Sequence, residues 1–117
     1  MIYFIHDRQS GAIKIGQCWG DRGPRQALTN CQSGNPRELF IVAVLNHFAF
    51  YDEDPEEPRL SVEWIKAKFR KKKIRLSWFQ AGPVIDWLRG TCAKRFVIPD
   101  YNLIPQSKRY RRVNANH

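Results

Sequence analysis

The chain has 117 residues, of which 43% are hydrophobic, 13% aromatic and 26% charged, a composition typical of one soluble globular domain. No apolar stretch approaches the roughly 18 residues that a membrane-spanning helix needs, and the first residues lack the pattern of a secretory signal, so we expect a cytoplasmic protein without a membrane partner. The net charge of +9 indicates a polyanionic partner instead.

The charge is divided unevenly along the sequence. Residues 1–58 contain five Lys/Arg and eight Asp/Glu, a net charge of −3, whereas residues 59–117 contain fifteen and three, a net charge of +12. A strongly basic half beside a mildly acidic half favours nucleic acid as the partner. The plainer interpretation, in which the basic residues only form a solvated surface, stays open.

Three cysteines, Cys18, Cys31 and Cys92, are an odd number without Cys-x-x-Cys spacing. This spacing is typical neither of a zinc site nor of a disulfide framework. We therefore expect reduced thiols.

The first segment with a clear structural pattern is Tyr3–Gly16, YFIHDRQSGAIKIG. Apolar residues at 2–5 and 12–15 indicate two short strands, and the polar residues 7–11 between them end in a glycine that can adopt positive φ. The pattern predicts a β-hairpin.

A helix and a strand are expected next. Gly23-Pro24 is typical of a helix start, Ala27, Leu28 and Cys31 supply an apolar face, and Gly34-Asn35-Pro36 ends the helix. The apolar run 39–45 predicts a strand that is buried on both faces and is the central or third strand of the sheet.

An acidic segment, residues 51–58, follows this strand, and we interpret it as a solvated loop. A helix is predicted over 60–73, with Val62, Ile65 and Phe69 toward the core. Residues 74–79 are expected to be extended. Gly82-Pro83 then precedes a helix over 84–89 that stops at Gly90.

Basic residues gather at two places, and both are candidates for contacts with a nucleic-acid backbone. The first cluster lies on the predicted helix and just after it, and the second lies in the C-terminal tail. The candidate nucleic-acid-binding residues are Lys66, Arg70, Lys71, Lys72, Lys73, Arg75, Lys108, Arg109, Arg111 and Arg112.

The hairpin carries two motifs, Ile2-Tyr3 in its first strand and Lys14-Ile15-Gly16 at the end of its second. With Arg25, the Ser33–Pro36 turn, Ile65, Phe69 and Trp78-Phe79 following in order, the chain resembles the GIY-YIG nuclease superfamily over roughly residues 1–80. The similarity is strongest to the branch of phage DNA-binding proteins whose second motif is Lys-Ile-Gly.

The resemblance implies a role for several residues. Tyr3 would orient or deprotonate the attacking water, Lys14 would contact the phosphate in place of the second tyrosine, and Arg25 would offset charge in the transition state. Arg22 competes with Arg25 for this role. Ile2, Ile15 and Gly16 would complete the structural motif.

The family also implies one Mg²⁺ or Mn²⁺ ion held by a glutamate on the second helix. Val62 stands at the matching position, and Glu63, one residue further along, is the candidate metal ligand. One residue rotates a helical position by about 100°, so Glu63 would face away unless the helix register shifts.

The sequence therefore predicts an α/β fold with a small, mainly antiparallel three-stranded sheet flanked by helices. Residues 1–90 would form a GIY-YIG-like domain and residues 91–117 an extension with a basic tail. The expected function is DNA binding, with metal-dependent endonuclease activity if the metal site is complete. A catalytically inactive nucleic-acid-binding module and a protein-interaction subunit with a basic surface are the alternatives.

Overall fold

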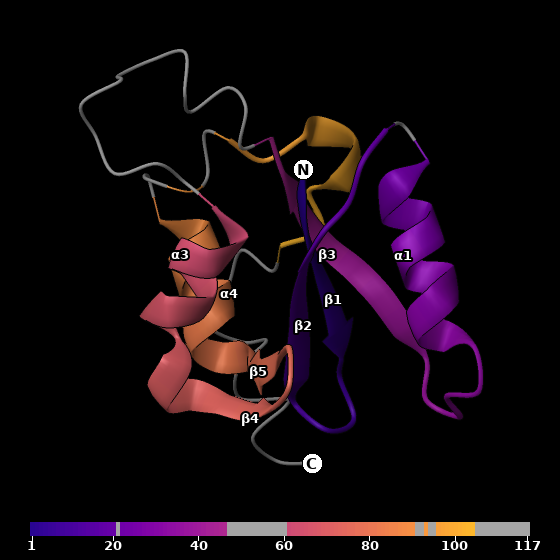
Figure 1. Cartoon of the computed structure of the whole chain (residues 1–117), viewed down its shortest axis with the longest axis horizontal. Helices are drawn as coiled ribbons and strands as arrows, with labels where there is room; N and C mark the ends of the chain where they lie inside the picture. The colour runs from indigo at the N-terminus through magenta and orange to yellow at the C-terminus, as the bar shows by residue number, and fades with distance from the viewer. Residues whose placement is uncertain (21, 47–60, 91–92, 94–95, 105–117) are drawn as a thin grey trace.

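A computed structural model describes residues 1–20, 22–46, 61–90, 93 and 96–104. The fold is α/β, with one antiparallel sheet of five strands in the order β3-β1-β2-β5-β4 and, among the described residues, three α-helices (Figure 1). The elements are β1 (Ile2–Asp7), β2 (Ala12–Gln17), α1 (Gly23–Gln32), β3 (Leu39–Leu45), α3 (Val62–Lys68), β4 (Lys73–Arg75), β5 (Trp78–Gln80) and α4 (Ala81–Arg89). Two short 3₁₀ helices span Arg70–Lys72 and Pro99–Tyr101.

The predicted hairpin is confirmed as β1 and β2. Gly11 closes the turn at a φ of 70°, which glycine adopts without steric cost. Asp7 holds the same turn, because its carboxylate accepts hydrogen bonds from the backbone amides of Gln9 and Ser10 and from Arg37. The sheet is thus anchored at the turn that joins β1 and β2.

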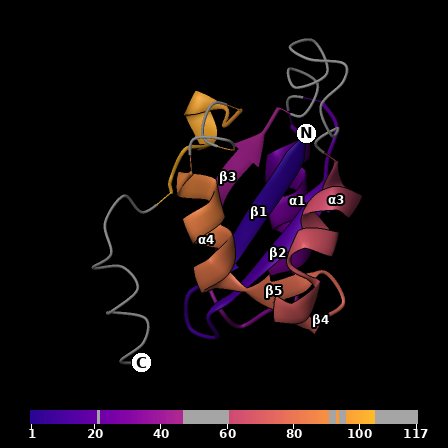
Figure 2. The ribbon, with the colours of Figure 1, turned by 90° about the vertical axis from the view of Figure 1, so that its left-hand side faces the viewer.

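The sheet has two differently covered faces because side chains alternate along each strand. On one face, Phe4 and Ile15 belong to a core that includes Ile65 of α3 and Leu88 of α4. On the other face, Tyr3 and its neighbours pack against α1. Figure 2 shows α3 and α4 in front of the sheet and α1 behind it.

The three-stranded sheet expected from the sequence is wrong, because β4 and β5 extend the sheet to five strands. The single helix predicted over 60–73 is also wrong. Helix α3 already ends at Lys68, and a 3₁₀ turn then leads into β4. Four consecutive cations, residues 70–73, repel one another on a helix, and in the extended form Lys73 instead pairs with Phe79.

Strand β3 is buried on both faces, as predicted, but it is not central. It lies at the end of the strand order, where it pairs with β1 on one side and makes a single antiparallel bridge, Leu45 to Val97, on the other. Residues 96–104 cover its outer edge, where the amides of Ile98 and Leu103 donate to the carbonyl oxygens of Val44 and Val42. This part of the predicted C-terminal extension therefore contributes to the core through Phe96 and Ile104.

None of the helices within the described ranges combines the length and apolar character that crossing a membrane requires.

Candidate nucleic-acid interface

Tyr3 and Gly16 face each other across the β1–β2 ladder. A Cβ atom built on Gly16 would lie 2.2 Å from both Cζ and Oη of Tyr3. Only glycine therefore lets the Tyr3 ring lie flat across β2. The two motifs singled out in the sequence are linked by this contact, since the second supplies the space that the tyrosine of the first occupies.

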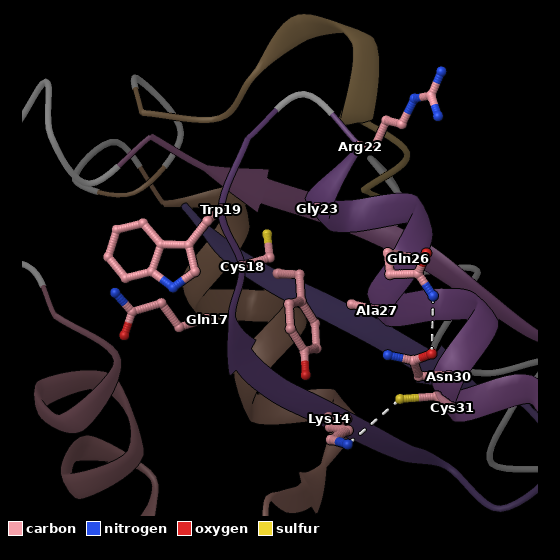
Figure 3. A pocket seen from close by; sticks show the side chains of 11 residues that line it. Lys14, Gln17, Cys18, Trp19, Arg22, Gly23, Gln26, Ala27, Asn30 and Cys31 are labelled. Atoms are coloured by element: carbon pink, nitrogen blue, oxygen red, sulfur yellow. Dashed lines mark hydrogen bonds between the residues drawn. The ribbon is translucent and has the colours of Figure 1, made fainter.

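A pocket of about 510 Å³ opens between β2 and α1 (Figure 3), and Tyr3 is one of its lining residues. We call it the phosphate pocket, after the ligand that we propose for it below. Lys14 lies at one end of this pocket and Arg22 lies at the other. None of its described lining residues is acidic. They are Tyr3, Lys14, Gln17, Cys18, Trp19, Arg22, Gly23, Gln26, Ala27, Asn30 and Cys31.

Lys14 is held in place by α1, because its Nζ donates to Sγ of Cys31 at 3.4 Å. Cys18 and Cys31 are both free thiols, and Cys92, the third cysteine of the sequence, lies outside the described residues. Three residues of α1 that line the pocket, Gly23, Ala27 and Cys31, are spaced four apart and therefore lie on one face of the helix. This periodicity was visible in the sequence as the apolar face of the predicted helix.

The Tyr3 hydroxyl is a hydrogen-bond donor at neutral pH. Burial raises the pKa of Tyr3 above its usual value of 10, and the nearby charge of Lys14 opposes this only in part. The pocket therefore presents a neutral phenol beside an ammonium group, a pair that suits an oxyanion.

Only one of the two candidate arginines, Arg22, lines the phosphate pocket. Arg22 lies at the rim of the phosphate pocket with its guanidinium turned outward (Figure 3), whereas Arg25 does not line this pocket. Arg25 borders a second cavity of about 440 Å³, together with Asp100 and Tyr101, and Arg22 lines this cavity as well as the first. The structure thus brings Tyr3 and Lys14 together with Arg22, the alternative to Arg25.

The first basic cluster lies beyond the other edge of β2. Lys14 pairs with Trp78 of β5, and Trp78 pairs with Arg75 of β4, so these three residues form one row across the sheet. Neighbouring strands are about 4.8 Å apart, which brings Arg75 to roughly 10 Å from Lys14.

The cations next to this row are open to solvent. The side chains of Arg70, Lys71, Lys72, Lys73 and Arg75 are all exposed. In the part of the chain that the structure describes, no ion pair neutralises them. Lys66 differs, because it is half-buried and its Nζ donates to Oγ of Ser77 at 3.2 Å.

We call Arg22, Lys14, Arg75 and residues 70–73 the basic track. It runs from the start of α1, through the phosphate pocket, to the edge strand β4. There Arg75 shares the sheet face of Lys14, whereas Lys73, opposite the core residue Phe79, points to the other face. α1 covers the β1 and β3 side of this sheet face, and the β4–β5 hairpin extends away from it (Figure 1). The track therefore unites residues from both halves of the sequence.

Glu63, the candidate metal ligand, is exposed on α3 and does not line the phosphate pocket. Val62 beside it is buried in the core, as are Ile65 and Phe69. Within the described ranges, no three His, Cys, Asp or Glu side chains gather as a metal site would require. A phenol and two cations without a carboxylate do not fit Mg²⁺ or Mn²⁺, which prefer oxygen anions.

Several predicted features lie outside the described residues. These are the acidic segment 51–58 and the tail residues Lys108, Arg109, Arg111 and Arg112. Sequence reasoning did not single out Trp19, Gln26 and Asn30, which line the pocket. For Gln26 and Asn30 the signal was present, since they follow Arg22 at intervals of four.

Comparison with known protein families, with curated proteins and with solved structures finds no match. The resemblance to GIY-YIG nucleases thus rests on the motif residues themselves and stays a prediction.

Proposed function

We propose that this chain is a nucleic-acid-binding protein, with DNA as the expected partner, and that the phosphate pocket holds one backbone phosphate. The observation that carries the proposal is the row from Lys14 through Trp78 to Arg75, which joins the pocket to the exposed cations of residues 70–73. One phosphate in the pocket would place the next phosphates of the same strand along the basic track.

The pocket residues suit this role. Lys14 would contact a non-bridging oxygen as a point charge, and the protonated Tyr3 hydroxyl would donate a hydrogen bond to the same group. Arg22, at the rim, would reach a neighbouring phosphate. These contacts recognise the backbone and not the bases, so we expect weak sequence preference.

The two arginines at the start of α1, Arg22 at its N-cap and Arg25 in its first turn, offer a matched test. Fluorescence anisotropy with a labelled DNA duplex should be recorded over a range of salt concentrations for the wild type, Arg22→Ala and Arg25→Ala. Both variants lose one positive charge from the start of the same helix. We expect Arg22→Ala to weaken binding about threefold to tenfold and to reduce the salt slope by about one, because one phosphate contact is lost. We expect Arg25→Ala to change both quantities less.

Equal losses in the two variants would contradict the assignment of Arg22 to the pocket. Absence of any salt-dependent binding by the wild type would contradict the whole proposal. It would favour the protein-interaction alternative.

Phosphodiester cleavage, which the resemblance implies, is tested separately. Because no described lining residue of the pocket is a carboxylate, we expect plasmid DNA to be bound but to stay intact in Mg²⁺ and in Mn²⁺. A nicking assay with the wild type, Tyr3→Phe and Glu63→Gln checks this. Metal-dependent nicking that is lost in both variants would establish an endonuclease and would identify Glu63 as a ligand.

A further inference from the structure

The tip of the β4–β5 hairpin has an unusual conformation. Leu76, between the two strands, has a φ of 50°, and no other residue except glycine has a positive φ in the described part of the chain. A branched side chain is strained in this region, and such strain persists mainly where the residue serves a function. Glycine or asparagine would be the favoured residue at this turn.

The same tip exposes apolar surface. Leu76 is 72% exposed and Ile74, in β4, is 55% exposed. A single exposed leucine is ordinary in a folded protein, but here the exposed side chain also occupies a strained position, so neither packing nor local conformation explains it. A partner that covers this tip would account for both features.

The chemistry around Leu76 identifies the partner. Arg75 precedes it, residues 70–73 lie on the adjoining turn and strand, and no Asp or Glu occurs between Glu63 and Asp86. A surface that carries two exposed apolar side chains among many cations is complementary to a polyanion that has an apolar interior. Duplex DNA has this character, because stacked bases lie between two rows of phosphates.

We propose that Leu76 is a wedge that enters the minor groove and separates two adjacent base pairs, while the cations of the basic track hold the flanking phosphates. The inference rests on the proposed function and adds to it the substrate class, a bendable duplex. Minor-groove proteins insert leucine and similar side chains in this manner, and flexible pyrimidine–purine steps are separated most easily. An anionic lipid surface is less suited, since only two side chains would enter it.

The test uses a duplex with 2-aminopurine at a central TA step, because this base fluoresces more strongly when it is unstacked. The proteins compared are the wild type, Leu76→Ala, Leu76→Gly and Leu103→Ala. Leu76→Gly removes the side chain and also relieves the positive φ, so the turn forms readily. Leu103, 64% exposed and remote in sequence from the hairpin, is the matched control.

We expect the wild type and Leu103→Ala to raise the fluorescence and both Leu76 variants not to raise it. Affinity should fall about tenfold in the Leu76 variants, because a leucine side chain is no longer buried, with an unchanged salt slope since no charge is removed. Salt-dependent binding with the same fluorescence rise in Leu76→Ala would overturn the wedge and leave the proposed function intact. Absence of salt-dependent DNA binding by the wild type would overturn both.

A vesicle assay distinguishes the other anionic surface. Binding to phosphatidylserine vesicles that is lost in Leu76→Ala, with no unstacking signal from the duplex, would overturn the wedge in favour of a lipid surface. Failure of the wild type to bind such vesicles, together with the expected fluorescence pattern, would support the duplex.

Discussion

At the residue scale, Tyr3 serves both the fold and the pocket. Its ring is buried against α1 and over Gly16, with only 8% of the residue exposed, and the residue also lines the phosphate pocket. The burial that stabilises the sheet also raises the pKa of the phenol and keeps it protonated. A structural cause thereby produces a chemical property of the site.

His6, on the opposite face of β1, predicts an acid-sensitive fold. Burial first, and then the charge of Arg8, lower its pKa from 6.5 to about 4, with Asp7 opposing them. The native state therefore holds the imidazole neutral, whereas the unfolded chain takes up a proton below its pKa of 6.5. Stability from this group is complete above that pKa and is lost as the pH falls toward 4.

We expect the free energy of unfolding to be about 2 kcal/mol lower at about pH 5 than at about pH 7.5. Urea unfolding at both values measures the difference, with His6→Gln as the comparison. The variant should lose most of this pH dependence. An equally steep dependence in His6→Gln would contradict the assignment. The lowered pKa of Asp7, where burial is outweighed by hydrogen bonds from Ser10 and Arg37, affects stability only at lower pH.

The sequence could not decide whether Arg22 or Arg25 lines the pocket, and the reason is geometric. Both residues lie where the predicted helix begins, and which of them meets the pocket depends on the rotation of the helix about its axis. That rotation is set by packing of Ala27, Leu28 and Cys31 against the sheet. The apolar face was predicted correctly, but the motif order alone favoured Arg25.

At the element scale, the β1–β2 pair predicts a strict requirement for glycine at position 16. We expect Gly16→Ala to destabilise the fold by about 1–3 kcal/mol, because the added methyl group overlaps the Tyr3 ring and the ring cannot move without leaving the core. Urea or thermal unfolding measures the loss.

Gly82→Ala is the matched control for this substitution. A Cβ atom on Gly82 meets nothing within 4 Å, and the residue lies in the first turn of α4. We expect this variant to lose clearly less stability than Gly16→Ala, since the added methyl group meets only its chain neighbour Pro83, whose ring mildly disfavours a Cβ on the preceding helical residue. If Gly16→Ala proved equally harmless, Tyr3 would not lie across β2 as described.

The elements that the sequence predicted well are the ones with long, regular patterns. The run 39–45 and the Gly23-Pro24 helix start are examples, and both were confirmed. Residues 74–79 were correctly expected to be extended, but their division into β4 and β5 was not predicted, because three residues are too few to show alternation. The start of β4 was missed because the basic residues 70–73 continued a helical pattern. Pairing of Trp78 with Lys14 is a tertiary contact that no local pattern reveals.

At the scale of the whole molecule, the fold brings cations from the two differently charged halves of the sequence close together. The mildly acidic first half builds the phosphate pocket with Lys14 and Arg22, and the basic second half adds residues 70–75 at the sheet edge. The β2–β5 pairing is the link between them. Neither half contains the basic track by itself, and it is this combination of charge and topology on which the proposal of a nucleic-acid partner rests.

The central claim is that DNA lies along the basic track, and amide correlation spectra of nitrogen-15-labelled protein test it most directly. During titration with a short duplex, we expect the largest shift changes at Lys14, Arg22 and residues 70–76, with small changes around Arg25 and in the core of α4. Changes centred on another face, or no changes at low salt, would contradict the account.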